Sequence, residues 1–179
     1  METAVVSQLI DQYGMDVMRF CRSLTRCACD AEDLYQQTFL KLLQLRVKVE
    51  REQNPRAFLF SIASGIWKNE CRKWGRRTDI APSSSLEELL AQPPQEPQDG
   101  GDLQQQVLDR MCQQELARAV QRLEEKYRSP VILMYRFGMG IDEIARIERV
   151  PKGTIKSRLS RARKQLRKEM EERGYAQEF

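Results

Sequence analysis

GTIKSRLSRARKQL, residues 153–166, carries the clearest helical pattern of the sequence. Its apolar residues recur at steps of three and four, which is the spacing of one face of an α-helix: Ile155, Leu159, Ala162 and Leu166. Lysine, arginine and serine occupy the opposite side. The pattern predicts a helix that packs one face on a core and presents a basic, hydrogen-bonding face outward.

A shorter helix is predicted just upstream, over residues 141–147. Val150-Pro151-Lys152 separates the two helices, because proline cannot continue the first one. Two short helices joined by a tight turn form a helix-turn-helix, whose second helix enters the DNA major groove. Residues 149–168 hold nine Lys and Arg and no Asp or Glu, which favours a polyanionic partner. A basic run alone would indicate only the solvated face of a bundle.

The predicted second helix supplies the candidate contacts to duplex DNA. Ser157 and Arg161 lie opposite the apolar stripe, so both can approach base edges. Arg158 and Arg163 lie toward the flanks and are expected to meet phosphates. The full candidate set is Thr154, Lys156, Ser157, Arg158, Ser160, Arg161, Arg163 and Lys164.

The charge of the chain is unevenly distributed along its 179 residues. Its net charge is only +4, yet residues 78–109 contain seven acidic residues and no Lys or Arg. Residues 79–102 are also rich in Pro, Ser and Gly, which is typical of a linker. We therefore predict an all-α protein with two small helical domains, 1–78 and 103–179, joined by a flexible acidic linker over 79–102.

Helical periodicity extends over both predicted domains, and no stretch alternates as a strand does. Apolar residues from Ile10 to Leu24 predict a first helix. Asp30 is expected to cap a second helix, and Asn54-Pro55 to open a third that continues to Trp74. Ser129-Pro130 is expected to open a helix that ends near Gly138.

The end of the predicted third helix mixes aromatic and cationic residues. Cations can follow phosphates while aromatic rings stack on unpaired bases, so the mixture suits single-stranded DNA. The alternative is that both tryptophans pack in the core, and Trp67 lies close to the apolar stripe. Trp74, among charges, is the better candidate for exposure.

The sequence offers no candidate catalytic, cofactor or metal site. It contains no histidine, and Cys21, Cys27 and Cys29 cluster without a second cysteine pair at zinc spacing. Thiols packed in the core are the favoured interpretation; a cysteine-based redox or metal enzyme is the alternative. No apolar run is long enough for membrane insertion and no signal peptide is visible, so we expect a cytoplasmic protein with reduced cysteines.

Three motifs together resemble the bacterial extracytoplasmic-function (group IV) RNA polymerase sigma factors. Residues 30–41, DAEDLYQQTFLK, resemble the polymerase-binding helix of that family. Residues 54–63, NPRAFLFSIA, resemble the start of its promoter-melting helix. Residues 123–131 and 143–163 resemble its C-terminal DNA-binding domain. The segments occur in the family's order and at its spacing, and they cover nearly the whole chain outside the linker.

The resemblance implies a transcription initiation factor without chemistry of its own, whose expected partners are core RNA polymerase, promoter DNA and an anti-sigma factor. Polymerase would be bound by Asp33, Gln36, Gln37 and Leu40. The melted minus-ten element would be held by Trp67, Lys68, Asn69, Arg72, Lys73, Trp74, Arg76 and Arg77. The helix-turn-helix would read the minus-thirty-five element. The linker would thread toward the active-site cleft, or serve only as a solvated tether.

The sequence departs from the family pattern at a few positions. Ser64-Gly65 stands where arginine and asparagine are usual, and Asn69 where aspartate is usual. Gln37 replaces a common acid, and Arg149 replaces the usual glycine of the turn. The main alternative function is a helix-turn-helix regulator that binds duplex DNA and does not join polymerase. That alternative leaves the N-terminal helices without a role.

Overall fold

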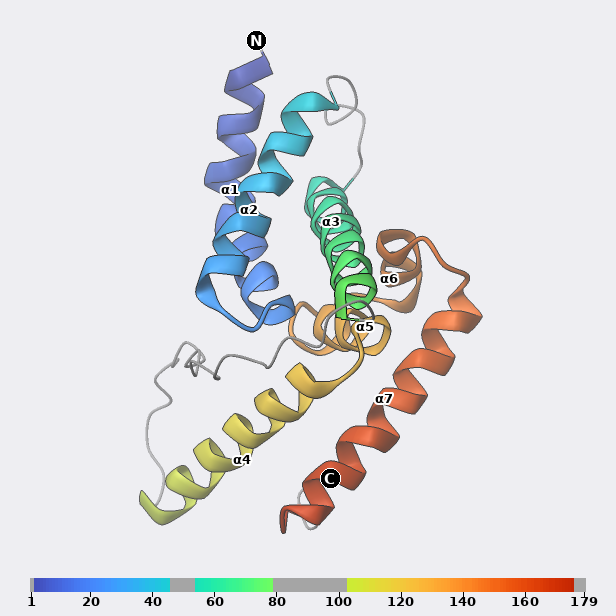
Figure 1. Cartoon of the computed structure of the whole chain (residues 1–179). Helices are drawn as coiled ribbons and strands as arrows, with labels where there is room; N and C mark the ends of the chain where they lie inside the picture. Colours follow the sequence, from blue (N-terminus) through green and yellow to red (C-terminus); the bar gives the residue numbers. More distant parts are fainter. Residues whose placement is uncertain (1, 46–53, 79–102, 176–179) are drawn as a thin grey trace.

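A computed structural model describes residues 2–45, 54–78 and 103–175 of the chain (Figure 1). These ranges contain seven α-helices and no strand, so the all-α prediction is confirmed. The helices are α1 (Glu2–Leu24), α2 (Ala28–Gln44), α3 (Pro55–Thr78), α4 (Leu103–Arg122), α5 (Glu125–Tyr135), α6 (Ile141–Glu148) and α7 (Lys152–Glu172). The predicted linker lies outside the described residues.

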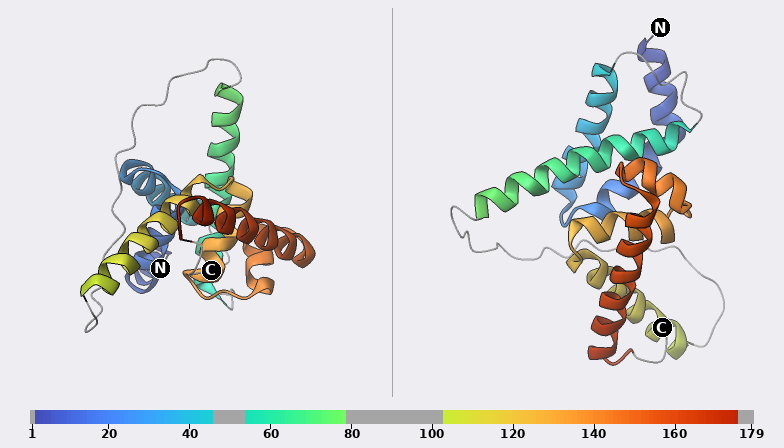
Figure 2. Two further views of the ribbon diagram at one scale, coloured as in Figure 1. Left: turned by 90° about the horizontal axis from the view of Figure 1, so that it is seen from below. Right: turned by 90° about the vertical axis from the view of Figure 1, so that its right-hand side faces the viewer.

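Helices α1, α2 and α3 pack on one another and form the N-terminal half (Figures 1 and 2). Val17, Phe20 and Leu24 of α1 are fully buried, as their helical spacing predicts. They meet Leu59 and Ala63 of α3, which are also fully buried. The apolar stripes therefore assemble the bundle.

The starts of α2 and α3 agree with prediction to different degrees. Asn54 accepts a hydrogen bond from the backbone N–H of Ala57 at 3.0 Å, so the expected cap ahead of Pro55 is confirmed. The expected cap at Asp30 is wrong. Cys27 is the N-cap instead, and its Sγ accepts a hydrogen bond from the backbone N–H of Asp30 at 3.3 Å. Asp30 lies one turn inside, where its charge still favours the helix N-terminus.

Helices α4 to α7 form the C-terminal half, and α6 and α7 make the predicted helix-turn-helix. The expected helix start at Ser129-Pro130 is wrong, because α5 begins at Glu125 and continues through Pro130. Proline lacks the N–H that would bond to the carbonyl four residues back. Burial of the neighbouring Val131 and Leu133 offsets this loss.

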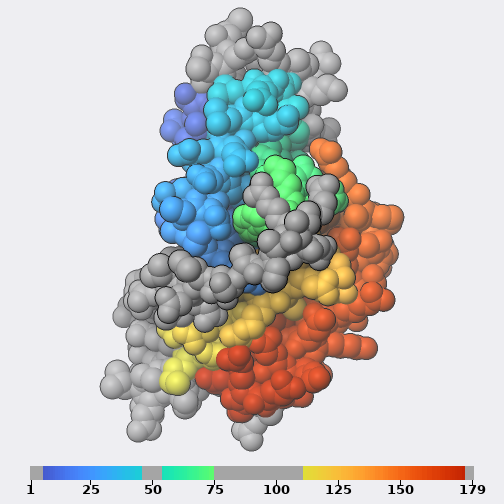
Figure 3. All heavy atoms as spheres, viewed as in Figure 1, coloured from blue at the N-terminus to red at the C-terminus, as the bar shows by residue number. Residues whose placement is uncertain are grey.

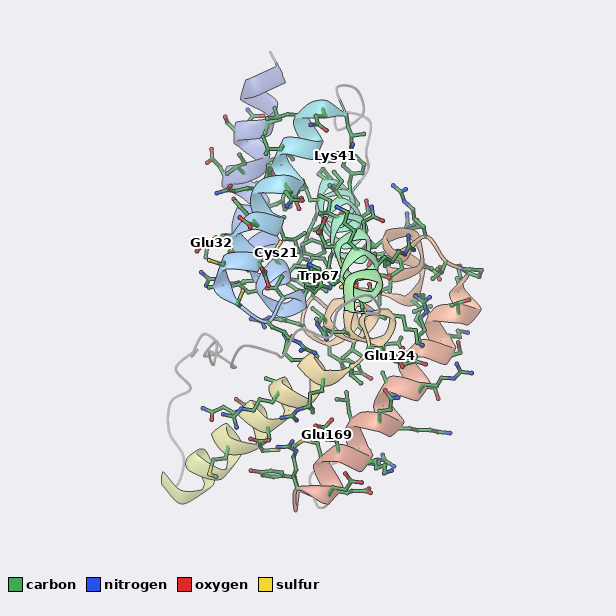
Figure 4. All side chains as sticks on the ribbon, viewed as in Figure 1. Cys21, Glu32, Lys41, Trp67, Glu124 and Glu169 are labelled. Atoms are coloured by element: carbon green, nitrogen blue, oxygen red, sulfur yellow. The ribbon has the colours of Figure 1, made fainter. Side chains whose placement is uncertain are left out.

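Ion pairs near the C-terminal end of α7 connect α7 to α4. Glu169 lies on the side of α7 that faces α4 (Figure 4), where it pairs with Arg122. Arg173, just beyond α7, pairs with Glu115 of α4. Cys112 of α4 is buried. Polar bridges at the rim and an apolar interior thus fix α4 along α7.

The two halves pack directly against each other, which the sequence did not predict (Figure 3). Phe20 of α1 stacks on Phe60 of α3 with 4.7 Å between ring centroids. Phe137, between α5 and α6, meets Phe20 and Phe60 edge-on at 5.8 and 4.9 Å. The Arg56 guanidinium lies 5.5 Å from the centroids of Phe60 and Phe137. We call these three rings the aromatic junction.

A buried arginine joins the halves at a second point. Arg128 of α5 donates hydrogen bonds to the carbonyl of Leu24 at 2.8 Å and to those of Gln121 and Leu123 at 2.5 and 2.8 Å. These carbonyls lie at the C-terminal ends of α1 and α4, where no further helical N–H can reach them. One side chain thus caps a helix from each half.

Candidate nucleic-acid and polymerase interfaces

Contacts at both ends of the turn between α6 and α7 fix its conformation. Arg149 adopts the left-handed conformation, with φ 55° and ψ 45°, so the non-glycine residue does occupy the position that usually needs glycine. The following N–H, of Val150, returns to the carbonyl of Ala145 at 3.1 Å. Lys152 closes the turn through an ion pair with Asp142 at 2.7 Å. These contacts hold α7 at a defined angle to α6.

Helix α7 separates its residues into a buried and an exposed side, as predicted. Ile155, Leu159, Ala162 and Leu166 are buried against the rest of the C-terminal half. The exposed candidates are Lys156, Ser157, Arg161, Arg163 and Lys164, whereas Thr154, Ser160 and Arg158 are half-buried. The exposed side therefore combines positive charge with side chains that can reach base edges or phosphates.

The end of α3 carries the predicted aromatic and basic cluster. Trp67 is buried and Trp74 is 41% exposed, in agreement with their expected placement. The two rings meet edge-to-face at 5.4 Å between centroids. Both views of Figure 2 show the last turns of α3 projecting from the body of the molecule. An aromatic ring is thus presented on a protruding helix and supported from beneath by a second ring.

The remaining candidates of α3 have different surroundings. Asn69, Arg72 and Lys73 are exposed, and Lys73 pairs with Glu70 at 2.6 Å. Lys68 is half-buried and points toward the C-terminal half, where it forms an ion pair. The side chains of Arg76 and Arg77 lie outside the described residues, although their backbone belongs to α3.

The predicted polymerase-binding residues share one exposed face of α2. Asp33, Gln36, Gln37 and Leu40 are exposed, while Leu34, Phe39 and Leu42 are buried on the opposite side. Leu43 extends the exposed face and was missed by sequence reasoning. Its position three residues after Leu40 was the available signal. The face combines polar groups with two leucines, 57% and 44% exposed, that nothing covers among the described residues.

A buried carboxylate between the halves was also missed. Glu148, the last residue of α6, is 4% exposed. Ser64 and Ser129 donate hydrogen bonds to its Oε1 at 2.9 and 2.6 Å. Lys68 pairs with its Oε2 at 2.5 Å, and Arg158 lies 3.9 Å from the same oxygen. We call these five residues the Glu148 cluster.

The signal for Glu148 lies in the periodicity of α6. Ile141, Ile144 and Ala145 precede it by seven, four and three residues, so all four share one face of the helix. Ile144 and Ala145 are buried, and Glu148 continues their face. An acid at the end of an apolar stripe predicts a buried polar partner.

The cysteines do not form a reactive cluster in the described part of the chain. All five are free thiols; Cys21 is buried as predicted, and Cys112 is buried too. Burial raises the pKa of Cys21 to about 12 and that of Cys71 to about 11. Both thiols therefore stay protonated near neutral pH, and a protonated thiol is a poor nucleophile.

Residues 2–45, 54–78 and 103–175 hold neither a candidate membrane span nor a candidate metal cluster. Among those residues, no helix is long and apolar enough to cross a membrane. The same residues contain no group of three or more potential metal-ligating side chains.

Both halves match models of the same protein family. Residues 9–77 match "Sigma-70 region 2", and residues 113–166 match "Sigma-70, region 4". The first range includes α2 and nearly all of α3, and the second includes α6 and α7 as far as residue 166. The two matches together cover more than half of the chain.

Curated relatives align over most of their length. The chain is 30% identical to the ECF RNA polymerase sigma factor EcfG of Rhodopseudomonas palustris, over 82% of this chain and 75% of that protein. It is 29% identical to the ECF RNA polymerase sigma factor SigL of Mycobacterium tuberculosis, over 97% and 93%.

Solved structures agree at the level of the fold. The sigma factor RpoE of Bartonella quintana, solved in complex with the anti-sigma factor NepR, superposes with a TM-score of 0.72 at 28% identity, over 92% of this chain and 96% of that chain. CnrH, solved in complex with the cytosolic domain of CnrY, superposes with a TM-score of 0.60 at 20% identity, over 95% and 90%. The arrangement of helices, the two family matches and these relatives lead to one conclusion: the chain belongs to the ECF RNA polymerase sigma factors.

Proposed function

We propose that this sigma factor binds core RNA polymerase through α2, holds the opened minus-ten element with the end of α3, and reads the minus-thirty-five element with α7. The observation that carries the proposal is the helix-turn-helix whose second helix buries an apolar stripe and exposes a basic face. The division of the chain into domains 1–78 and 103–179 with a linker over 79–102 belongs to the same proposal. We further propose that the protein supplies recognition only, while the polymerase performs nucleotidyl transfer in the cytoplasm.

The partners follow from this division of labour. Core RNA polymerase and promoter DNA are required by the activity of a sigma factor. An anti-sigma factor is a third proposed partner, supported by the two solved relatives, which were both obtained as complexes. Co-purification of the tagged chain from its host would identify polymerase subunits and any inhibitor together.

The role of α2 rests on its exposed mixed face. Asp33 and Gln36 lie one turn apart and are exposed, so replacing both with alanine should leave the fold intact. We expect weaker binding to purified core polymerase, with an unchanged circular dichroism spectrum. Glu171→Ala, an exposed acidic residue near the end of α7 in the other half, is the control. Equal affinity of the double variant and the control would remove the assignment.

The role of α3 rests on the exposure of Trp74 at a protruding helix end. Trp74→Ala should reduce open-complex formation more than initial promoter binding, because unpaired bases can stack on its ring. Permanganate footprinting measures the opened bases, and a gel-shift assay measures initial binding. Equal losses in both steps would indicate that the ring serves only to cover Trp67.

The reading of duplex DNA is tested by separating base contacts from phosphate contacts. Arg161 is exposed opposite the buried stripe, and Arg163 is exposed on its flank. Arg161→Ala should weaken the free energy of binding to the duplex by about 1–3 kcal/mol and should reduce the base preference at one base pair. Arg163→Ala should weaken binding to all DNA sequences alike, and the affinity should then depend less steeply on salt concentration.

The measurement is binding to a panel of single-base variants of the upstream element at several salt concentrations. A uniform loss of affinity by Arg161→Ala across the panel would show that α7 enters the groove in another rotation.

Transcription in vitro distinguishes the proposed function from the alternative, a duplex-DNA regulator that does not bind polymerase. Promoter-dependent transcripts should appear only when the chain is added to core polymerase.

A further inference from the structure

The turn of the helix-turn-helix contains a residue that its backbone conformation does not favour. Arg149 is the only non-glycine residue with a positive φ in the part of the chain that the structure describes. The backbone N–H of Val150 bonds back to the carbonyl of Ala145 at 3.1 Å and closes the end of α6. This closure requires a left-handed residue just before Val150. Glycine adopts that conformation without strain, whereas the Cβ of an arginine crowds the following carbonyl oxygen.

Contacts inside the protein do not explain the arginine at this position. Its side chain is exposed, and it makes no ion pair or hydrogen bond with another described residue. The two other cations at the turn have partners. Lys152 pairs with Asp142 at 2.7 Å, and the Nε of Arg146 donates to the backbone carbonyl of Asp142 at 3.4 Å. A strained residue whose side chain stabilises nothing in the fold indicates a function outside it.

The place of Arg149 in the fold brings its guanidinium to the proposed DNA interface. Helix α7 begins at Lys152, three residues later. The first residues of the second helix of a helix-turn-helix enter the major groove, so the turn before them lies beside the phosphates that border the groove. The turn is at the outer edge of the molecule, away from α1 and α2 (Figure 1). A guanidinium there can form two hydrogen bonds with one phosphate.

From these observations we propose that Arg149 binds a phosphate of the DNA backbone beside the upstream element, and that this contact offsets the strain of the turn in the complex. The inference rests on the proposed function, because a phosphate reaches Arg149 only when α7 lies in the groove. Arg149 begins the run of residues 149–168 that contains nine Lys and Arg and no acid, which favours a polyanion as the ligand. A phosphate contact raises affinity without carrying sequence information.

The experiment uses the full chain assembled with core polymerase, and a duplex that carries the upstream element. Arg149→Gly removes the guanidinium and the strain together. Arg149→Asn removes the charge but keeps a side chain that tolerates the left-handed conformation. Arg149→Lys keeps the charge. Arg118→Gln is the matched control, because it removes one exposed positive charge from α4, where Glu115 connects Arg118 to Arg173 beyond the far end of α7.

We expect Arg149→Gly and Arg149→Asn to bind the duplex about fivefold more weakly at physiological salt, with a salt-dependence slope smaller by about 0.9, which is the loss of one phosphate contact. Arg149→Lys and Arg118→Gln should keep the slope of the unmodified chain. Affinity for every single-base variant of the duplex should fall alike.

Stability should change in the opposite direction. In urea denaturation of the full chain without polymerase, Arg149→Gly should raise the ratio of folded to unfolded molecules about threefold, because the relief of strain exceeds the flexibility that glycine adds to the unfolded chain. A destabilised Arg149→Gly would overturn the strain on which the inference rests.

Unchanged duplex affinity and salt slope in Arg149→Gly and Arg149→Asn would overturn the phosphate contact. An equal loss of slope in Arg118→Gln would also overturn it, because the effect would then come from net charge. Weaker binding to core polymerase with unchanged DNA binding would overturn it as well, and would place Arg149 at a protein contact.

The proposed function fails separately from this inference. If Arg161→Ala weakens duplex binding and Arg149→Gly does not, the function of α7 stands and the phosphate contact is overturned. If Arg149→Gly lowers the salt slope and Arg161→Ala changes nothing, the phosphate contact is supported and the base-reading role of Arg161 is overturned.

Discussion

Glu125 is the residue whose ionisation opposes the folded state. Burial raises the pKa of its carboxyl above the ordinary value of 4.5, and the nearby charge of Glu148 raises it further. Lys68, Arg158 and Arg128 lower the pKa in part. Because the folded state favours the protonated form, the ionised form at neutral pH reduces the free energy of unfolding.

Glu125→Gln should therefore raise the melting temperature at pH 7. A raised pKa gives stability that is complete below the unfolded value and is lost as pH rises through the folded value. The advantage of the variant should shrink as pH falls through the raised pKa and vanish below about 4.5. Thermal melts from pH 4 to 8 measure this, with Glu124→Gln, an exposed neighbour, as the control.

Arg128 donates hydrogen bonds to three backbone carbonyls at helix ends. Arg128→Lys retains a charge but cannot direct donors to Leu24, Gln121 and Leu123 together. We expect a loss of about 3 kcal/mol in the free energy of unfolding, measured by urea denaturation. Arg118→Lys, at an exposed ion pair of α4, should change it by less than about 0.5 kcal/mol. Equal effects would show that Arg128 is not a cap.

At the scale of an element, α3 contains a glycine that no contact requires. Gly65 is exposed in mid-helix, and an added Cβ would meet nothing within 4 Å. Gly65→Ala should stabilise the protein by about 1 kcal/mol in urea denaturation. Gly138→Ala should instead destabilise it, because Gly138 has a φ of +64°, which strains an alanine. A stabilising Gly138→Ala would contradict this reasoning.

Helices were predictable because their apolar residues repeat within a short window, as in α1 and α7. Their starts were less predictable. At α2 a cysteine caps in place of the expected Asp30, since its sulfur can accept a hydrogen bond that a propensity scale does not anticipate. At α5 the buried neighbours of Pro130 override the usual preference of proline for the first turn.

The exposed candidate residues were predictable for the same reason as the helices. Once Ile155 and Leu159 are assigned to the core, Ser157 and Arg161 must face away from it. The aromatic contacts between the halves had no local signal, because Phe137 and its partners are far apart in the sequence. Lys68 accordingly looked like an exposed cation and is instead paired with a residue of the other half.

At the scale of the whole molecule, the two halves share one continuous core. We expect the full chain to unfold in a single cooperative transition, with helical content and tryptophan fluorescence changing together. Phe137→Ala should separate the two signals, because it removes the ring that meets Phe20 and Phe60. Coincident transitions in this variant would show that the aromatic junction does not couple the halves.

The hydrogen bond from Arg128 to Leu24 can form only late in the synthesis of the chain. Its guanidinium completes the end of α1 at Leu24, 104 residues earlier in the chain. A ribosome that adds about 5–20 residues per second needs roughly 5–20 s to cover that distance. During this interval the carbonyl of Leu24 lacks its hydrogen bond from Arg128, and Phe20 and Phe60 lack their contacts with Phe137. The emerging N-terminal half is therefore a natural client for chaperones that shield apolar surface on nascent chains.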